Sequence, residues 1–235
     1  MFMKMLCIGA YLSHMNDDLI HDFSKMPGLA GVFLFGLRHP KAQSHRAAFR
    51  HNLQRLGWVI GNALAQDWPM REIKVETGLG TATCTVPAEQ PVLATILRAG
   101  IPMHAGVLEV WDQADCAFVS AYRKKNSKGG FDIEIEYLGA PSSEGRILVI
   151  VDPMLATGAS MVAAYKALVS DGIPSKLHII SALASPEGLD YAQRELPEGT
   201  TFWIGAVDDG LDENDYIVPG LGDAGDLSYG SKSRS

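Results

Sequence analysis

The sequence predicts an α/β fold in which a mainly parallel sheet is flanked by helices. Strand-like apolar runs at 91–97, 116–122, 146–151, 177–183 and 201–206 alternate with helical stretches near 103–112, 160–171 and 187–196. This alternation favours a parallel sheet, because the crossover between two parallel strands usually contains a helix. With 235 residues, of which 47% are hydrophobic, the chain can bury one large core. We therefore expect residues 1–235 to form a single domain.

A long amphipathic helix is expected before the alternating part. Within residues 43–66, large apolar side chains recur at helical spacing at Phe49, Leu53, Leu56, Ile60 and Leu64. Arg50 and Arg55 fall elsewhere on the helix surface, which completes the amphipathic pattern.

Two further segments are expected to be antiparallel. Residues 72–77 and 81–86 have strand-like patterns on either side of Gly78-Leu79-Gly80, which predicts a β-hairpin. Residues 131–137 alternate strictly between polar and apolar, which favours an exposed antiparallel strand.

The segment 146–160, RILVIVDPMLATGAS, carries the strongest functional signal. Apolar residues lead directly into a loop that contains Asp152, Thr157 and Ser160, and a helical pattern follows. Backbone amides at a helix N-terminus favour an anion, and the two hydroxyls can donate to phosphate oxygens. A carboxylate at the strand end can accept hydrogen bonds from sugar hydroxyls. Together these groups fit a ribose 5-phosphate.

This segment resembles the 5-phosphoribosyl diphosphate (PRPP) loop of type I phosphoribosyltransferases. The wording DPMLATG, with Pro153 where most members have a second acid, is typical of uracil phosphoribosyltransferases. The stretches PVLATILRAG at 91–100 and YIVPGLGDAGD at 216–226 agree with that family in the same order. The resemblance covers roughly residues 36–230 and leaves 1–35 as a poorly matched N-terminal extension.

The resemblance implies a type I phosphoribosyltransferase fold with a β-hairpin and a C-terminal base-binding loop. It also implies the reaction uracil + PRPP → UMP + diphosphate, a step of pyrimidine salvage catalysed by a pentosyltransferase. Mg²⁺ is expected to arrive with PRPP, without a direct protein ligand that the sequence identifies. The family further implies a homodimer or a higher homo-oligomer.

Residues 98–100 follow a buried strand and precede a helix, the position where ligands of open α/β sheets collect. Arg98 and the adjoining amides could hold a diphosphate, and Gly100 permits close approach or unusual dihedrals. From these three residues alone, an ordinary strand-to-helix turn with a solvent-exposed arginine is the favoured explanation. The resemblance identifies this segment as the pyrophosphate loop.

The cationic segment 123–130, RKKNSKGG, has two readings. A run of lysines usually forms a solvated surface. The resemblance instead matches Arg123 to a PRPP-contacting arginine in a loop that closes over the site and excludes water, with Gly129 and Gly130 as its hinge.

The segment GLGDAG at 220–225 spells a dinucleotide-binding fingerprint, but this interpretation is rejected. The chain ends ten residues later, and Pro219 disfavours the strand that should lead into such a motif. A tight loop that exposes backbone groups could instead match the polar edge of uracil. We expect residues 207–230 to form a uracil-binding hood.

The resemblance assigns the site residues individually. Catalysis falls to Asp152, Arg98 and Arg123. PRPP binding falls to Arg98, Ala99, Gly100, Arg123, Asp152, Pro153, Met154, Leu155, Ala156, Thr157, Gly158, Ala159, Ser160 and Asp223. Uracil binding falls to Tyr216, Ile217, Gly222, Asp223 and Ala224, with Tyr216 at the C5 side of the base. Asp223 is also expected to reach toward PRPP and its metal.

Composition excludes several classes of function. The net charge of −7 gives no general basic field, so nucleic-acid binding is not expected. Three cysteines without a CxxC pair indicate a reducing, cytoplasmic setting. The apolar stretch 5–12 is too short to cross a bilayer, so no membrane association is expected.

Other prominent residues receive structural interpretations. The acidic run at 208–215 is expected to solvate a surface turn rather than bind calcium. The histidines lack metal-ligand spacing, and Trp58, Trp68, Trp111 and Trp203 fit core or interface packing.

Two alternative functions stay open. One is a PRPP- or UMP-binding pyrimidine regulator on the same fold. The other is a catalytically weak homologue, because Ala159 stands where many relatives have Gly, and a methyl group there would hinder a loop that needs φ > 0.

Overall fold

The computed structural model describes residues 17–125 and 131–232. Its centre is an eight-stranded sheet in the order β1-β10-β9-β7-β4-β5-β6, with β8 also paired to β9. All of these pairings are parallel except that between β5 and β6. The strands are β1 (Ile20–Asp22), β4 (Val92–Leu97), β5 (Asp115–Lys125), β6 (Phe131–Gly139), β7 (Ile147–Val151), β8 (Met154–Leu155), β9 (Lys176–Ala184) and β10 (Thr201–Val207). The predicted fold class is confirmed.

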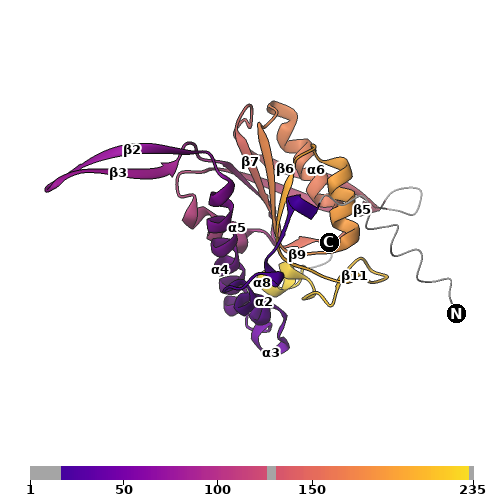
Figure 1. The fold of residues 1–235 in the computed structure, drawn as a ribbon. Helices are drawn as coiled ribbons and strands as arrows, with labels where there is room; N and C mark the ends of the chain where they lie inside the picture. Colours follow the sequence, from indigo (N-terminus) through magenta and orange to yellow (C-terminus); the bar gives the residue numbers. More distant parts are fainter. Residues whose placement is uncertain (1–16, 126–130, 233–235) are drawn as a thin grey trace, which may run out of the picture.

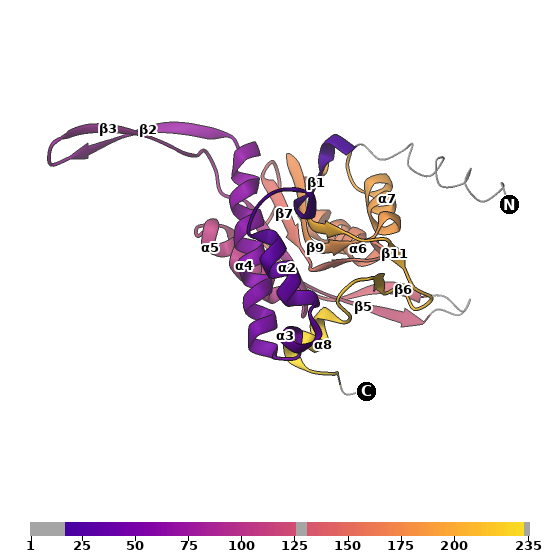
Figure 2. The same ribbon diagram turned by 60° about the horizontal axis from the view of Figure 1, so that its bottom comes forward.

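Two layers of helices cover the sheet (Figure 2), with α2 and α4 on one side and α6 and α7 on the other. The helices are α2 (Ala30–Arg38), α3 (Pro40–Gln43), α4 (Arg46–Leu64), α5 (Ile101–Val110), α6 (Ala159–Leu168), α7 (Pro186–Glu195) and α8 (Ala224–Tyr229). Short 3-10 turns are η2 (Asp17–Leu19), η3 (Phe23–Lys25), η4 (Ala65–Asp67) and η5 (Val169–Asp171). None of the helices in the described part of the chain is both long and apolar enough to cross a membrane.

Strand β7 is buried on both faces, which explains its unbroken apolar sequence. Val149 and Val151 belong to the core cluster shared with α4 and α5. Leu148 and Ile150 belong to the cluster shared with α6 and α7. Asp152 therefore follows directly after five buried residues.

The predicted hairpin is confirmed, and it projects away from the rest of the molecule (Figures 1 and 2). Strands β2 (Met70–Thr77) and β3 (Gly80–Pro87) pair along their whole length around Gly78 and Leu79. They form a separate two-stranded sheet whose side chains are almost all exposed. The alternation of polar and apolar residues in this segment therefore belongs to an exposed two-stranded ribbon and not to a strand with one buried face.

The first described residues are more integrated than the poor family match of 1–35 suggested. β1 extends the central sheet by pairing with β10. Leu34 and Leu37 of α2 are buried in the core, whereas Val32 and Phe35 of the same helix are exposed. Because apolar residues lie on the exposed face of α2 as well as on its buried face, the helix lacks the polar face that marks a surface helix, and it was not predicted.

The antiparallel strand expected at 131–137 is confirmed as β6, which pairs with β5. The loop predicted at 123–130 lies partly outside the described residues. The backbone of β5 continues to Lys125, and residues 126–130 are not described.

Close contact between α4 and α5 depends on glycine. A Cβ atom at Gly106 would lie 1.8 Å from the carbonyl oxygen of Gln54, and one at Gly57 would lie 2.2 Å from that of Met103. Because the obstructing atoms are backbone, neither helix can yield locally. This contact fixes α5, whose N-terminus follows residues 98–100.

Replacing Gly106 with Ala should therefore destabilise the protein strongly. The added methyl must push α5 away from α4, and overpacking of this kind costs about 3 kcal/mol. Gly31→Ala is the matched control, because nothing lies within 4 Å of a Cβ at Gly31 in α2. It should be neutral or stabilising by up to about 1 kcal/mol. Urea unfolding of both variants checks this, and equal stabilities would contradict the proposed steric role of Gly106.

Candidate active site

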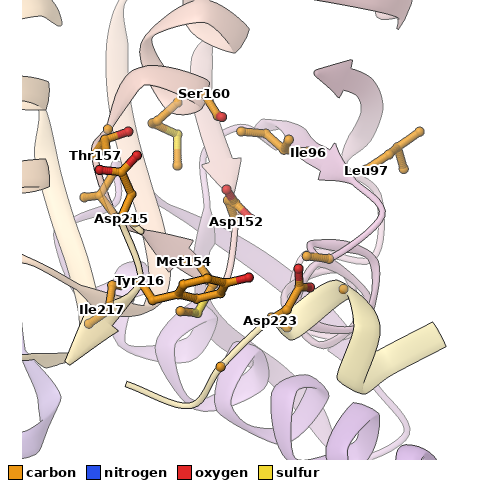
Figure 3. Close-up of a pocket in the computed structure, with 18 residues that line it drawn as sticks. Ile96, Leu97, Asp152, Met154, Thr157, Ser160, Asp215, Tyr216, Ile217 and Asp223 are labelled. Atoms are coloured by element: carbon orange, nitrogen blue, oxygen red, sulfur yellow. The ribbon is translucent and has the colours of Figure 1, made fainter. Parts of the chain in front are cut away.

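A cavity of about 240 Å³ opens at the carboxyl ends of β4 and β7 (Figure 3). It brings together three segments that are distant in sequence, within 96–99, 152–161 and 215–225. The predicted site residues that line it are Ala99, Asp152, Met154, Leu155, Ala156, Thr157, Gly158, Ser160, Tyr216, Ile217, Gly222, Asp223 and Ala224. The three predicted loops therefore converge, as the topology of a parallel sheet requires.

Asp152 lies in the middle of this arrangement, between Ser160 on one side and Tyr216 and Asp223 on the other (Figure 3). The residue is 9% exposed. Burial raises the pKa of its carboxyl group to about 7, partly opposed by a hydrogen bond from the Met154 backbone. The free protein therefore holds this carboxyl group in an environment where its charge is costly.

The loop between β8 and α6 has the geometry of an anion-binding site. Gly158 caps α6 with φ +77°, and Ala159 begins the helix. The N-terminus of α6 thus faces the cavity, where its free amides can receive an anion. Since the left-handed position is Gly158, the methyl group of Ala159 does not strain the loop.

Residues at the N-terminus of α7 hold the same loop in place. The Ser185 hydroxyl donates to the carbonyl oxygen of Ala156 at 2.7 Å and accepts from the Gly188 amide. A Cβ at Gly188 would lie 2.1 Å from the Ala156 oxygen. This close packing holds the loop in a defined shape without help from a ligand.

Residues 98–100 occupy different positions around the cavity. Ala99 lines it, whereas neither Arg98 nor Gly100 does. Gly100 is buried, and its φ of −70° is one that any residue can adopt. Glycine is needed here because a Cβ atom would lie 2.1 Å from the Thr95 hydroxyl oxygen. The peptide bond between Leu97 and Arg98 is cis.

The Arg98 side chain reaches toward the C-terminal segment. Its Nη2 lies 3.4 Å from the Asp226 carboxylate and 3.3 Å from the Gly230 carbonyl oxygen. Its Nε is buried without a partner in the described part of the protein. A buried donor without a partner calls for one, and Arg98 would have to turn from Asp226 and Gly230 toward the cavity to bind an anion there. The side chain of Arg123 lies outside the described part of the protein.

The C-terminal loop at 216–225, here called the base loop, is held by the short helix α8 and by β12 (Ile217–Val218). Strand β12 pairs with β11 (Gly210–Leu211). Asp223 caps α8 by accepting from the Asp226 amide at 2.8 Å. Ala224 is the first helical residue and is 2% exposed. An amide at this helical position has no partner within the helix, so it is free to face a ligand.

The acidic run at 208–215 was predicted to be a solvated surface turn, and this is wrong for Asp208. Its side chain is 5% exposed and forms an ion pair with Arg38. Asp212 is exposed, but its carboxylate accepts from the amides of Asn214 and Tyr216 and so shapes the turn. Asp215, with φ +63°, lines the cavity on the same side as Thr157 (Figure 3).

The predicted structural roles of the aromatic residues are largely confirmed. Trp68, Trp111 and Trp203 are buried, whereas Trp58 is 46% exposed. His178 accepts from the Trp203 indole at 3.2 Å, and burial, with the charges of Lys176 and His21, lowers its pKa to about 3. His178 is therefore a neutral core residue at the opposite end of the sheet from the cavity.

Five lining residues were not predicted: Ile96, Leu97, Met161, Asp215 and Gly225. Leu97, Met161 and Gly225 directly adjoin predicted residues, and Ile96 lies two positions before Arg98, so wider boundaries around each motif could have included them. Asp215 immediately precedes Tyr216, but it was interpreted as part of the solvated acidic run.

Three features together define a type I phosphoribosyltransferase: a helix N-terminus at the cavity, a buried acid after a parallel strand, and a C-terminal loop over the same cavity. The family model described as uracil phosphoribosyltransferase matches residues 37–231. The chain belongs to the uracil phosphoribosyltransferase family.

Relatives from bacteria and archaea agree with this membership. The chain is 48% identical over 204 residues to a uracil phosphoribosyltransferase of Porphyromonas gingivalis, covering 87% of this chain and 94% of the relative. It is 36% identical over 221 residues to one from Thermococcus gammatolerans, covering 93% and 96%. The solved structure of the AQ2163 protein from Aquifex aeolicus is similar with a TM-score of 0.79 and 29% identity, covering 90% and 98%.

Asp152→Asn should stabilise the free protein increasingly as pH rises. The pKa of Asp152 is raised from 3.8 to about 7, so between these values the folded state holds a proton that the unfolded chain releases. The free energy of unfolding of the wild type therefore falls as pH rises through this window, and the loss is complete above it. Asparagine does not titrate and escapes this loss.

Thermal unfolding without ligand at several pH values between 5 and 8 checks this prediction. The difference in Tm between Asp152→Asn and the wild type should grow with pH. Asp112→Asn, at an exposed aspartate after α5, serves as the control and should show a constant difference. A pH-independent difference for Asp152→Asn would contradict the raised pKa.

Proposed function

We propose that this protein transfers the 5-phosphoribosyl group of PRPP to N1 of uracil, giving UMP and diphosphate in pyrimidine salvage. The observation that carries the proposal is the convergence of a phosphate loop, a buried aspartate and a base loop on one cavity. Membership of the uracil phosphoribosyltransferase family supports uracil as the base. We extend the proposal to a cytoplasmic location and a homo-oligomeric assembly.

The difficult step is the separation of charge as the bond between ribose C1 and the diphosphate oxygen breaks. No covalent nucleophile is required, because N1 of a positioned uracil can attack the cation-like C1 directly as the C1–O bond breaks, and the N1 proton passes to the departing diphosphate or to water. Catalysis then depends on electrostatic stabilisation and on the exclusion of water. In this proposal the amides and hydroxyls of 156–160 hold the 5-phosphate, and Asp152 accepts from the ribose hydroxyls.

Charge on the leaving diphosphate must also be neutralised. We assign this to Arg98 and Arg123. The orphaned Nε of Arg98 is consistent with an anionic partner at this edge of the site. Arginine suits this role because its planar, permanently charged fork can hold two oxygens at once.

The acidic residues of the cavity fit Mg²⁺ that enters with PRPP. No group of three metal-ligating side chains occurs among residues 17–125 and 131–232. Asp152 and Asp223 line one cavity, and either carboxylate could approach an ion that enters with PRPP. When bound, Mg²⁺ would offset negative charge on the leaving group.

The base loop can distinguish uracil from cytosine through backbone groups. Uracil has an acceptor at O4, whereas cytosine has an amino donor at the corresponding position. An Ala224 amide directed at this edge would pair with the first and face a second donor in the other. Mismatched polar groups are costly once they are desolvated, so discrimination should be large.

The direct test is to incubate the purified protein with Mg-PRPP and, separately, uracil, cytosine, hypoxanthine and orotate, then identify products by mass. UMP from uracil alone is the expected result. Binding of UMP or PRPP without turnover would instead identify the regulator or the weak homologue considered above. A nucleotide formed from another base would overturn the assignment of substrate.

Ala224→Pro should remove uracil transfer while leaving the fold intact. Ala224 is the first residue of α8, where proline is well tolerated, and Asp223 before it has φ −83° and ψ 106°, which a following proline permits. The substitution therefore deletes the amide donor with little strain on the backbone. Steady-state formation of UMP should fall about a hundredfold or more.

Ala224→Ser is the matched control, because it keeps the amide and adds only a small polar group. It should retain the preference for uracil over cytosine even if turnover changes. Wild-type formation of UMP by Ala224→Pro would show that this amide does not read the base.

A further inference from the structure

Arg38 and Asp208 form a two-pronged ion pair beneath the base loop. Arg38 is the last residue of α2, and Asp208 follows the end of β10. The guanidinium nitrogens donate to the two carboxylate oxygens at 2.6 and 2.9 Å. The Asp208 side chain is 5% exposed and that of Arg38 is 26% exposed. A paired geometry of this kind fixes direction as well as distance.

Both partners also hold the backbone of Gly220. The Gly220 amide donates to the Asp208 carboxylate at 2.9 Å, and Arg38 lies 3.3 Å from the Gly220 carbonyl oxygen. Gly220 is buried with φ +59°, and a Cβ there would lie 2.0 Å from the Ile217 oxygen. Two charged side chains therefore hold the backbone of the loop at its turn at Gly220.

Another side chain holds the next residue of the loop, Leu221. Gln43 of α3 donates to the carbonyl oxygen of Leu221 at 3.4 Å, and also to those of Leu37 and Arg38 at the end of α2. The same short region of α2 and α3 thus holds two consecutive residues of the loop. Asp208 itself is fixed to the sheet, since its amide donates to Ala184 at the end of β9.

This anchored turn lies between the two parts of the loop that reach the cavity. Tyr216 and Ile217 precede it, and Gly222 and Ala224 follow it, and all four line the cavity. Arg38, Asp208 and Gly220 do not line it. The ion pair therefore cannot touch a base in the cavity, but it determines where the residues on both sides of the turn are held.

We infer that Arg38 and Asp208 are positioning residues for base recognition, which act by holding Gly220 and with it the backbone groups that face the base. This inference rests on the proposed function for the identity of the base. A shift of the loop would weaken uracil binding and discrimination against cytosine. The phosphate loop at 156–160 is held separately by α7, so the affinity for PRPP should change less than that for uracil, with Asp223 as the one PRPP-assigned residue in the shifted loop.

Arg38→Lys and Asp208→Asn test the inference. Lysine keeps the charge but cannot bridge both carboxylate oxygens and the Gly220 carbonyl group. Asparagine keeps the size but presents an amino group to the guanidinium or to the Gly220 amide. Each variant should raise KM for uracil about tenfold and lower the ratio of kcat/KM for uracil to that for cytosine, with KM for PRPP raised by a clearly smaller factor than KM for uracil.

The Arg146–Asp115 pair provides matched controls. Its Nη1 to Oδ2 distance is 2.7 Å, and it joins the amino ends of β5 and β7, opposite the cavity. Arg146→Lys and Asp115→Asn should leave both KM values and base selectivity unchanged. Circular dichroism and thermal unfolding of all four variants monitor the fold, and Arg38→Lys is the milder test if Asp208→Asn does not fold.

The outcomes separate the two proposals. If wild-type protein makes no UMP from uracil and Mg-PRPP, the proposed function fails. If the wild type is active but Arg38→Lys and Asp208→Asn keep its uracil KM and selectivity, the positioning role alone is overturned. An equal loss of kcat with every base, at unchanged KM, also overturns it, because it would indicate a general structural role.

Discussion

Burial of β7 between two helical layers is the constraint on which the site depends. The strand is apolar on both faces, so it can occupy only the middle of the sheet, with β4 and β9 as neighbours. Its carboxyl end must then open into the crevice above the sheet. Asp152, the next residue, is therefore buried, and desolvation raises the pKa of its carboxyl group. The same placement sets the N-terminus of α6 over the cavity.

Desolvation of Asp152 favours the protonated acid in the free protein, but the proposed chemistry needs a negative charge near a cation-like carbon. Hydrogen bonds from ribose hydroxyls would favour the charged form when substrate binds, because they supply the partners that water provides elsewhere. The cost of ionising a buried acid without partners is thus offset only in the complex. An isolated aspartate at the end of a buried strand is suited to interactions that strengthen during the reaction.

The base loop has a different physical origin from the phosphate loop. Residues 156–160 are held by the Ser185 hydroxyl and the closely packed Gly188 at the start of α7, next in sequence to β9 of the sheet. The loop at 216–225 has little regular structure of its own, with only β12 and the short α8 at its ends. It therefore depends on side chains from elsewhere, including Arg38, Gln43 and Arg50, which donates to the Ser228 carbonyl oxygen at 2.7 Å. The position of this loop is thus coupled to α2, α3 and α4.

Local sequence determined the elements whose signals lie within a few residues. The apolar runs of the parallel strands, the face of α4, the hairpin turn and the phosphate loop all have short-range patterns, and each was predicted close to its observed bounds. The residue-by-residue roles in PRPP and uracil binding came from family resemblance and stay predictions. Their convergence on one cavity follows from the parallel topology, which alternation already indicated.

Tertiary structure decided the features that arise between distant segments. Asp208 looked like part of a solvated acidic run, and only the approach of α2 to the end of β10 pairs it with Arg38, 170 positions away. The direction of the Arg98 side chain, the need for glycine at 57 and 106, and the projection of the hairpin away from the core also depend on packing. Charge and periodicity describe a residue's own neighbourhood along the chain, whereas burial and partners depend on which surfaces meet after folding.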